Sequence, residues 1–174
     1  MKSACSSLTL AAMTGLAAPA LAEAPNLRTP PPVIFLAENL DEKDQLGWCI
    51  DTLGRGFASD LQVHSCKPQG GDVQFSFEPE TGFIRSVAFP DYCASLRTTG
   101  EPTDFALVTC DEAASEQRFD YDPESGAIHP KDRPEHCLSA GQASRSAGPF
   151  MSRVLELTDC ETTEPALRHW IVRN

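Results

Sequence analysis

The residues of this chain with the clearest chemical potential are its cysteines. Seven occur in 174 residues, and six of them follow position 48. Six thiols can form three disulfides, in any of fifteen arrangements, or they can supply the thiolate ligands of a zinc site. Two cysteines separated by two residues, the usual zinc-binding pair, do not occur in the sequence. We therefore expect disulfides, and we expect no metal site.

The spacing of these cysteines reveals an internal repeat. Cys49, Cys93 and Cys137 follow one another at intervals of 44 positions (93 − 49 and 137 − 93). Repetition at one fixed period indicates copies of a supersecondary unit that bury their apolar faces against each other. Three copies predict a closed, threefold object, and an insertion at 141–150 lengthens the third copy. The repeat favours one disulfide within each copy: Cys49–Cys66, Cys93–Cys110 and Cys137–Cys160.

Short strands and tight turns are expected to build each copy. Residues 61–64 alternate apolar and polar, so Gln62 and His64 should face away from the core, where a ligand could reach His64. The segments 78–84 and 122–128 combine a proline with a later glycine, the pattern of a β-hairpin with a bulge. Further strands are expected at 33–36, 73–77, 117–121, 153–157 and 168–172, the last closing the barrel. The core candidates are Phe75, Phe77, Phe119, Tyr121 and Trp170.

No recognised catalytic constellation accompanies these elements. The four histidines lie outside any metalloprotease motif, and neither a nucleophile-elbow motif nor a phosphate-binding glycine loop is present. Glu161 and Glu164 lie in polar loop sequence, where solvent should leave both carboxylates with ordinary chemistry. We therefore predict that the chain is not an enzyme and needs no cofactor.

The amino-terminal residues resemble a secretory signal peptide. A lysine precedes an apolar run at 8–21, and Ala20-Leu21-Ala22 is a typical cleavage sequence, so we expect residues 1–22 to be removed after Ala22. The apolar run is too short to span a bilayer. A lipoprotein anchor on Cys5 is disfavoured because Cys5 precedes the run. The expected location is secreted or periplasmic, where disulfides persist.

The mature chain is expected to be one acidic domain behind a short lead-in. Residues 23–32 are rich in proline and should be extended rather than packed, and the domain should cover 33–174. Removing residues 1–22, which hold one lysine and no acidic residue, changes the formal charge from −11 to −12. Because no basic cluster exists to neutralise phosphates, nucleic acid is excluded as a partner.

The recurring motifs resemble those of the ricin B-type lectin family. The pattern C-x-[DS], followed by L-Q-x-x-x-C and a triplet ending in an aromatic residue, covers about residues 33–172. The matching triplets are Val73-Gln74-Phe75, Gln117-Arg118-Phe119 and Arg168-His169-Trp170. The second keeps the family's glutamine and the third its tryptophan. The resemblance implies an all-β fold, a β-trefoil of three repeats of about 44 residues, and it implies binding of a carbohydrate or glycoconjugate.

By the same resemblance, each repeat holds one shallow sugar site. In the first repeat Asp51 would accept hydrogen bonds from hydroxyls, the ring of His64 would stack on the sugar, and Asp72 would add a polar contact. Alternatively, Asp51 beside a glycine turn caps that turn, and His64 has no particular role. The matching positions hold Ser95, Val108 and Glu116 in the second repeat and Ser139, Thr158 and Leu167 in the third. We expect at most one competent site, in the first repeat.

The degenerate second and third repeats leave a second function open. A trefoil that has lost sugar binding could serve as a protein-interaction or toxin-targeting module, because a fold does not by itself fix a function. Sequence alone therefore supports two hypotheses of different classes, a lectin and a binding module for another protein.

Overall fold

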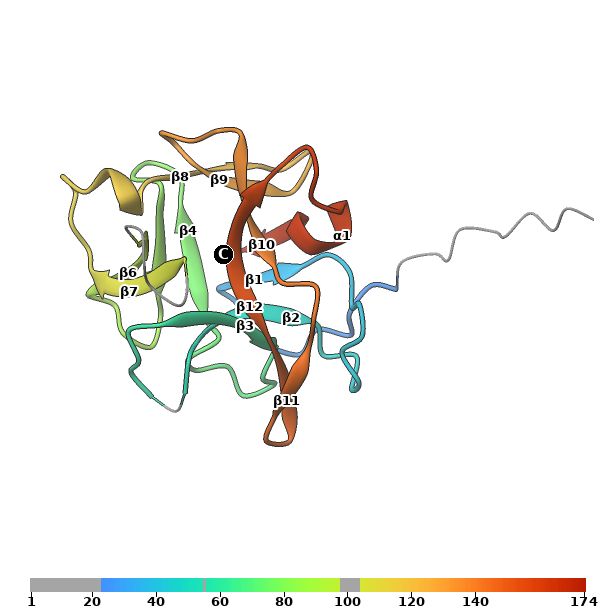
Figure 1. Ribbon diagram of the computed structural model, residues 1–174. Helices are drawn as coiled ribbons and strands as arrows, with labels where there is room; N and C mark the ends of the chain where they lie inside the picture. The colour runs from blue at the N-terminus through green and yellow to red at the C-terminus, as the bar shows by residue number, and fades with distance from the viewer. Residues whose placement is uncertain (1–22, 55, 98–103) are drawn as a thin grey trace, which may run out of the picture.

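The computed structural model describes residues 23–54, 56–97 and 104–174 and shows an all-β chain with one short α-helix (Figure 1). The signal peptide expected at 1–22 lies outside these residues. The elements are β1 (Val33–Leu36), β2 (Trp48–Thr52), β3 (Leu61–Ser65), β4 (Phe75–Glu78), β5 (Phe83–Ser86), β6 (Tyr92–Leu96), β7 (Phe105–Thr109), the 3-10 helix η1 (Ser115–Gln117), β8 (Phe119–Asp122), β9 (Ala127–Pro130), β10 (His136–Ala140), β11 (Arg145–Ala147), β12 (Phe150–Asp159), α1 (Pro165–Arg168) and β13 (Trp170–Arg173).

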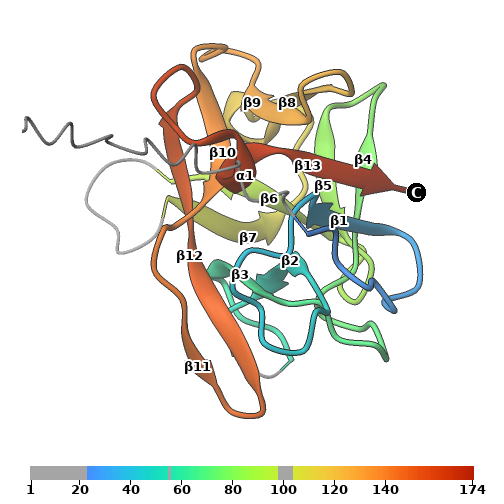
Figure 2. The same cartoon turned by 90° about the vertical axis from the view of Figure 1, so that its right-hand side faces the viewer.

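The strands pair in the same way in each of the three repeats. Each repeat has an antiparallel hairpin whose first strand contains the first cysteine of that repeat and whose second strand is followed directly by the second cysteine: β2–β3, β6–β7 and β10–β12. A second kind of pair joins successive repeats: β4–β5, β8–β9 and β1–β13. Figure 2 shows β13 beside β1, where Leu36 lies opposite Trp170. The last strand closes onto the first, as expected of the closed, threefold object that the period of the cysteines predicts and of the β-trefoil that the family resemblance implies.

The repeats meet in one hydrophobic core. Trp48 and Trp170 are fully buried, and each indole nitrogen is satisfied by a backbone carbonyl oxygen, at 2.8 Å from Asn39 and 2.8 Å from Leu138 respectively. The core candidates are confirmed, since Phe75, Phe77, Phe119 and Trp170 are buried and Tyr121 packs against them with part of its surface exposed. Core residues from all three repeats therefore pack together in one hydrophobic interior.

The predicted disulfides and turns are present. Each repeat contains its own disulfide: Cys49–Cys66, Cys93–Cys110 and Cys137–Cys160. The hairpins β4–β5 and β8–β9 turn through Gly82 and Gly126, whose φ angles of 75° and 69° lie in the left-handed region that favours glycine. Among the described residues no group of three or more His, Cys, Asp or Glu side chains is arranged to hold a metal ion. Within the same residues no helix has the length and apolar character needed to cross a membrane.

The lead-in, residues 23–32, differs from its prediction because it packs against the first repeat. Its backbone is extended, as expected, yet Thr29 is buried and its hydroxyl donates to the backbone oxygen of Lys67 at 2.8 Å. The backbone nitrogen of Asn26 also donates to the oxygen of Gln45, at 2.7 Å. The proline content predicted the extended backbone but gave no signal for these distant partners.

The insertion in the third repeat forms a β-hairpin that projects from the body of the molecule (Figures 1 and 2). In it Arg145 lies opposite Ser152, and Ala147 lies opposite Phe150. Strand β12 then continues along β3, where Ser152 pairs with His64. The third repeat thereby reaches over the first, at the strand on which the sequence placed a candidate ligand-binding residue.

Candidate functional site

The candidate site is built on β3, between β2 and β12. Asp51 of β2 lies opposite Gln62 of β3, and the two side chains share the face that points away from the core residue Val63. His64 is on the same face, as its alternation predicted. It is not exposed, however, because only 5% of its surface is accessible and the ring of Phe150 lies 5.5 Å from its own. The alternation identified the correct face but not the hairpin that covers it.

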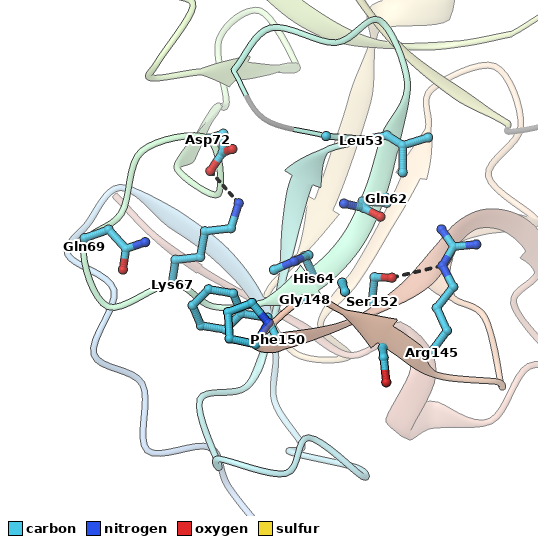
Figure 3. A pocket seen from close by; sticks show the side chains of 14 residues that line it. Leu53, Gln62, His64, Lys67, Gln69, Asp72, Arg145, Gly148, Phe150 and Ser152 are labelled. Carbon is cyan, nitrogen blue, oxygen red and sulfur yellow. Dashed lines mark hydrogen bonds and ion pairs between the residues drawn. The ribbon is translucent and has the colours of Figure 1, made fainter.

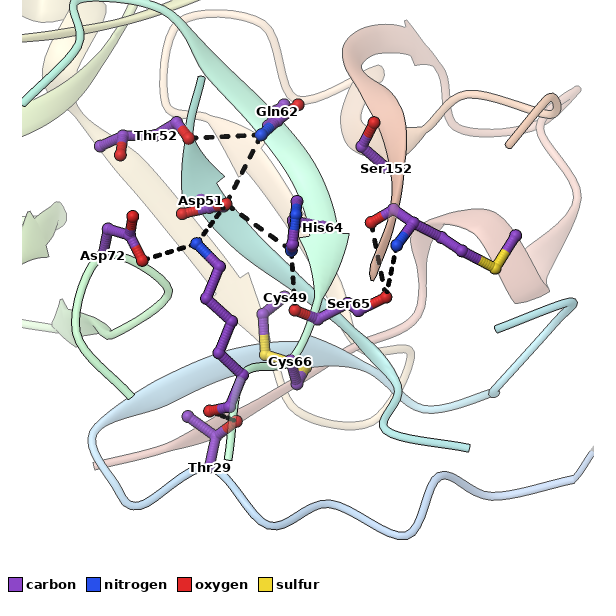
Figure 4. Close-up of polar contacts among 12 residues, drawn as sticks. Thr29, Cys49, Asp51, Thr52, Gln62, His64, Ser65, Cys66, Asp72 and Ser152 are labelled. Atoms are coloured by element: carbon purple, nitrogen blue, oxygen red, sulfur yellow. Dashed lines mark hydrogen bonds and ion pairs between the residues drawn. A yellow bond between two sulfur atoms is a disulfide. The ribbon is translucent and has the colours of Figure 1, made fainter. Parts of the chain in front are cut away.

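The three residues predicted for the sugar site lie in one polar network (Figure 4), in which His64 lies beside Asp51 and a lysine links Asp51 to Asp72. The ammonium group of Lys67 lies 3.1 Å from Asp51 Oδ2 and 2.7 Å from Asp72 Oδ1. The Nδ1 atom of His64 is 3.8 Å from Asp51 Oδ2, and the amide of Gln62 donates weakly to the same oxygen at 3.5 Å. Asp51 thus lies inside strand β2, fully buried, and the hypothesis that it caps a turn is wrong.

Lys67 is a site residue that sequence reasoning missed. It follows Cys66 directly and begins a loop rich in proline and glycine, and the family pattern marks no residue at that position. Its positive charge was the available signal. Two carboxylates that are removed from water together need a counter-ion, and Lys67 lies close to both Asp51 and Asp72.

Burial governs the ionisation of this network. Desolvation raises the pKa of the Asp51 carboxyl to about 7, against the opposing field of the Lys67 ammonium. Its second oxygen, Oδ1, is buried without a hydrogen bond from any residue that the structure describes. Burial lowers the pKa of His64, so the ring is neutral at pH 7. Nδ1 lies 2.9 Å from the Ser65 carbonyl oxygen and therefore carries the proton, which leaves Nε2 as an acceptor.

A pocket opens directly above this network (Figure 3). Its volume of about 550 Å³ falls within the range of about 300–1,000 Å³ that is usual for small-molecule sites. The lining is contributed by β3 and the loops around it on one side and by the β11–β12 hairpin on the other: Leu53, Gly54, Gln62, His64, Lys67, Gln69, Asp72, Arg145, Ser146, Ala147, Gly148, Pro149, Phe150 and Ser152. Polar donors and acceptors and two ring side chains thus surround one cavity.

The hairpin that walls this pocket is anchored to the first repeat at its base. The guanidinium of Arg153, 4% exposed, lies 4.8 Å from the ring of Trp48 and donates to the carbonyl oxygen of Gly141 at 2.6 Å. Arg153 also forms an ion pair with Asp41. The hydroxyl of Ser65 accepts from the backbone nitrogen of Met151 at 3.0 Å. These contacts hold β12 against the first repeat and thereby fix the position of Phe150.

The equivalent positions in the other repeats are occupied by interactions within the protein. In the second repeat Ser95 is buried and donates to the backbone oxygen of Leu96 at 3.2 Å. In the third repeat the hydroxyl of Thr158 donates to Ser139 at 2.9 Å, and Leu167 is buried in the hydrophobic core. Neither repeat offers a carboxylate and a ring side chain together at these positions, whereas Asp51 and His64 do so in the first.

Comparison with known proteins identifies the family of this chain. The family model that matches is the ricin-type β-trefoil lectin domain, over residues 39–170. The comparison with curated protein sequences found no match. Among solved structures, the chain is similar to a non-toxic homologue of type II RIPs from Momordica charantia (bitter gourd), in complex with α-methyl-D-galactoside. That likeness has 15% identity and a TM-score of 0.58 and covers 82% of this chain and 47% of the other, so this chain spans about half the length of the bitter gourd protein.

Two bacterial toxin structures are similar over most of their length. The likeness to a chain of the cytolethal distending toxin from Actinobacillus actinomycetemcomitans has 15% identity and a TM-score of 0.56, and it covers 80% of this chain and 88% of that one. For the Haemophilus ducreyi toxin the identity is 18% and the TM-score 0.56, with coverage of 85% and 89%. At these identities the solved structures support the fold alone. The family model covers most of the chain, and the chain therefore belongs to the ricin-type β-trefoil lectin domain family.

Proposed function

We propose that the protein is an exported carbohydrate-binding protein with one competent sugar site, in the pocket of the first repeat. The observation that carries the proposal is that a pocket of about 550 Å³ lies at the one repeat that keeps a carboxylate and a ring side chain at the sugar-binding positions of the family. Of the three predicted site residues, His64 and Asp72 line the pocket and Asp51 lies buried beneath it; Gln62, Lys67 and Phe150 are added by their positions in the lining. Catalysis has no part in this proposal.

The side chains have complementary roles toward a sugar. Asp72 Oδ2 and Gln62 Oε1 accept no hydrogen bond from any other described residue, so both are available to sugar hydroxyls. The Lys67 ammonium has three protons, of which Asp51 and Asp72 engage two, and the third is available as a donor. The ring of Phe150 offers an apolar surface to the C–H face of a sugar. Asp51 is too deeply buried for direct contact and instead holds Lys67 in place.

A shallow site of this kind should bind weakly and selectively. For a single sugar we expect millimolar to high-micromolar dissociation constants, equivalent to roughly −4 to −6 kcal/mol. A glycan array identifies the ligand, and titration calorimetry then measures its affinity for the wild-type protein.

The Asp72→Asn substitution tests the location of the site. It removes an anionic acceptor while Asp51 remains as a partner for Lys67, and we expect binding to weaken about tenfold. Glu116→Gln is the matched control, because Glu116 occupies the equivalent position in the second repeat and the substitution should leave affinity unchanged. If the folded wild-type protein binds no glycan on the array, the lectin proposal is wrong. If both variants bind like the wild type, the site lies elsewhere.

The second candidate function is that of a protein-interaction or toxin-targeting module. A specific observation favours it: Phe57 is 48% exposed, and its ring packs against Phe89 and Tyr92 with centroid distances of 5.2 and 4.7 Å. Val87 is 41% exposed as well. Exposed aromatic clusters are enriched where proteins bind one another. Under this hypothesis Phe57→Ser weakens association with a protein partner and Asp72→Asn does not.

We also propose that the chain is exported to the periplasm or the exterior after cleavage behind Ala22. Its three disulfides require an oxidising compartment for their formation. Intact-mass measurement of the protein recovered outside the cytoplasm should give a chain that begins at Glu23. A recovered chain that still carries residues 1–22 would contradict the proposed cleavage.

A further inference from the structure

One cation of the pocket lacks a counter-ion among the described residues. Arg145 lies on β11 and lines the pocket, and its Nε atom donates to the hydroxyl of Ser152 at 3.0 Å. Its two terminal nitrogens form no hydrogen bond or ion pair within the part of the chain that the structure describes. The neighbouring carboxylate, Asp41, is engaged by Ser144 and Arg153. The Ser152 contact therefore orients a guanidinium whose outer edge remains available.

The charges are segregated across the cavity. Figure 3 shows Lys67 and Asp72 on one side and Arg145 on the other, with His64 and Ser152 between them. On the first side the Lys67 ammonium is balanced by Asp51 and Asp72. Among the residues that the structure describes, the side that carries Arg145 has no such balance, even though the whole chain has a formal net charge of −11. An unbalanced arginine in an acidic protein, oriented at a cavity wall, is the arrangement that suits an anionic ligand.

We propose that the sugar recognised in this pocket carries a carboxylate, an inference that rests on the proposed carbohydrate-binding function. The two terminal nitrogens of Arg145 present parallel N–H donors that match the geometry of a carboxylate, which they bind in a bidentate fashion. The hydroxyls of the same sugar ring reach Asp72 and Gln62 across the cavity, and the ring packs against Phe150. A uronic acid has both groups, because its carboxylate and its ring hydroxyls lie at opposite ends of one pyranose.

The experiment compares two probes that differ only in the charged group. Methyl α-D-galacturonide and methyl α-D-galactoside are titrated separately into the wild-type protein at pH 7.5 by calorimetry. We expect the uronide to bind about tenfold more tightly, the scale of one charge-assisted hydrogen-bonded pair at a partly solvated site. Arg145→Gln should abolish the difference between the probes, because it removes the guanidinium that would bind the carboxylate of the uronide. Arg145→Lys, which keeps the charge but loses the fork, should give an intermediate preference.

Arg133→Gln is the matched control because Arg133 is exposed and lies outside the pocket. It should retain the full preference for the uronide. Equal binding of both probes by the wild type overturns the inference and leaves the lectin proposal intact. A preference that persists in Arg145→Gln overturns the assignment to Arg145. If neither probe binds, the inference is wrong, and the glycan array then tests the lectin proposal separately. Binding of a neutral glycan on the array supports the lectin proposal. An array without any binding contradicts the lectin proposal as well as the inference.

Discussion

Replacing Lys67 by methionine should destabilise the folded protein mainly above neutral pH. The substitution keeps the aliphatic stem and removes the ammonium group that lies 3.1 Å from Asp51 and 2.7 Å from Asp72. The two carboxylates differ in their access to water, because the side chain of Asp51 is 0% exposed and that of Asp72 is 18% exposed. Water can therefore replace Lys67 at Asp72 but not at Asp51. The cost of the substitution depends on whether Asp51 is ionised.

The magnitude follows from proton linkage. In the folded protein the pKa of Asp51 is raised from 3.8 to about 7 by burial. Between about pH 4 and pH 7 the folded state thus holds a proton that the unfolded chain has released, and stability from this group falls as the pH rises through that window. Lys67 opposes the raised pKa, so its removal raises the value further. At pH 6 Asp51 is mostly protonated in both proteins, and the variant loses chiefly the partly buried pair with Asp72, where water can replace the ammonium group, at a cost of about 1 kcal/mol.

Above pH 7 the two proteins diverge. The wild type releases the proton of Asp51, whereas the variant must keep it or bury an uncompensated charge. The difference in unfolding free energy should grow by about 1.4 kcal/mol for each pH unit, to about 3 kcal/mol at pH 9. This value is similar to the cost of removing one partner of a buried ion pair, about 3–5 kcal/mol. His64 does not disturb the comparison, because its folded pKa is lowered and it is neutral in both states above pH 7.

Urea unfolding at pH 6, 7, 8 and 9 measures these differences. The set consists of the wild type, Lys67→Met, Asp51→Asn and the double variant. Asn cannot ionise, so the cost of Lys67→Met in the Asp51→Asn background should be small and nearly independent of pH. A cost of Lys67→Met that is equally large at pH 6 and pH 9 would show that Asp51 is already ionised at pH 6, and it would refute the reasoning from burial.

Two further predictions concern the fold. Replacing Cys93 and Cys110 together by serine should lower the unfolding free energy by about 3 kcal/mol, because the disulfide closes a loop of 17 residues; an unchanged urea midpoint would contradict this. Gly126→Ala should lower the unfolding free energy by more than Gly148→Ala does. Both substitutions incur roughly 1 kcal/mol of backbone strain at similar φ angles. A Cβ at Gly126 would also lie 1.9 Å from the His169 ring, whereas one at Gly148 meets no atom within 4 Å. Equal melting temperatures of the two variants would show that the ring moves without cost.

The sequence predicted the fold because the relevant signals are local and recur. The cysteines and the turn glycines return at one period, and each hairpin carries its own apolar alternation. A disulfide within one repeat joins residues of the same hairpin, so no long-range information is needed to propose Cys49–Cys66 or Cys93–Cys110. The face of His64 was predicted for the same reason, since alternation along a strand depends only on the strand itself.

The burial of the site residues could not be predicted in this way. What covers His64 is Phe150 on a hairpin of another repeat, and the Ser65–Met151 hydrogen bond that holds this hairpin joins residues 86 positions apart. A strand pattern reports that a side chain leaves the core but not whether a distant segment returns to cover it. Asp51 illustrates the same limit, because its neighbouring glycines suggested a turn cap, whereas the strand pairing of β2 with β3 places it under Lys67.

The asymmetry of this trefoil explains why the candidate site belongs to one repeat only. In a threefold structure the hairpins of the three repeats have equivalent surroundings. The insertion at 141–150 changes these surroundings for the first repeat alone. The contacts that anchor the inserted hairpin, those of Arg153 and Met151, lie on β12 beyond its tip. The tip residues Gly148 and Pro149 are exposed and line the pocket. We therefore expect substitutions at the tip to alter the wall of the pocket without loosening its base, since the supporting pair of Asp51 and Lys67 lies in the first repeat.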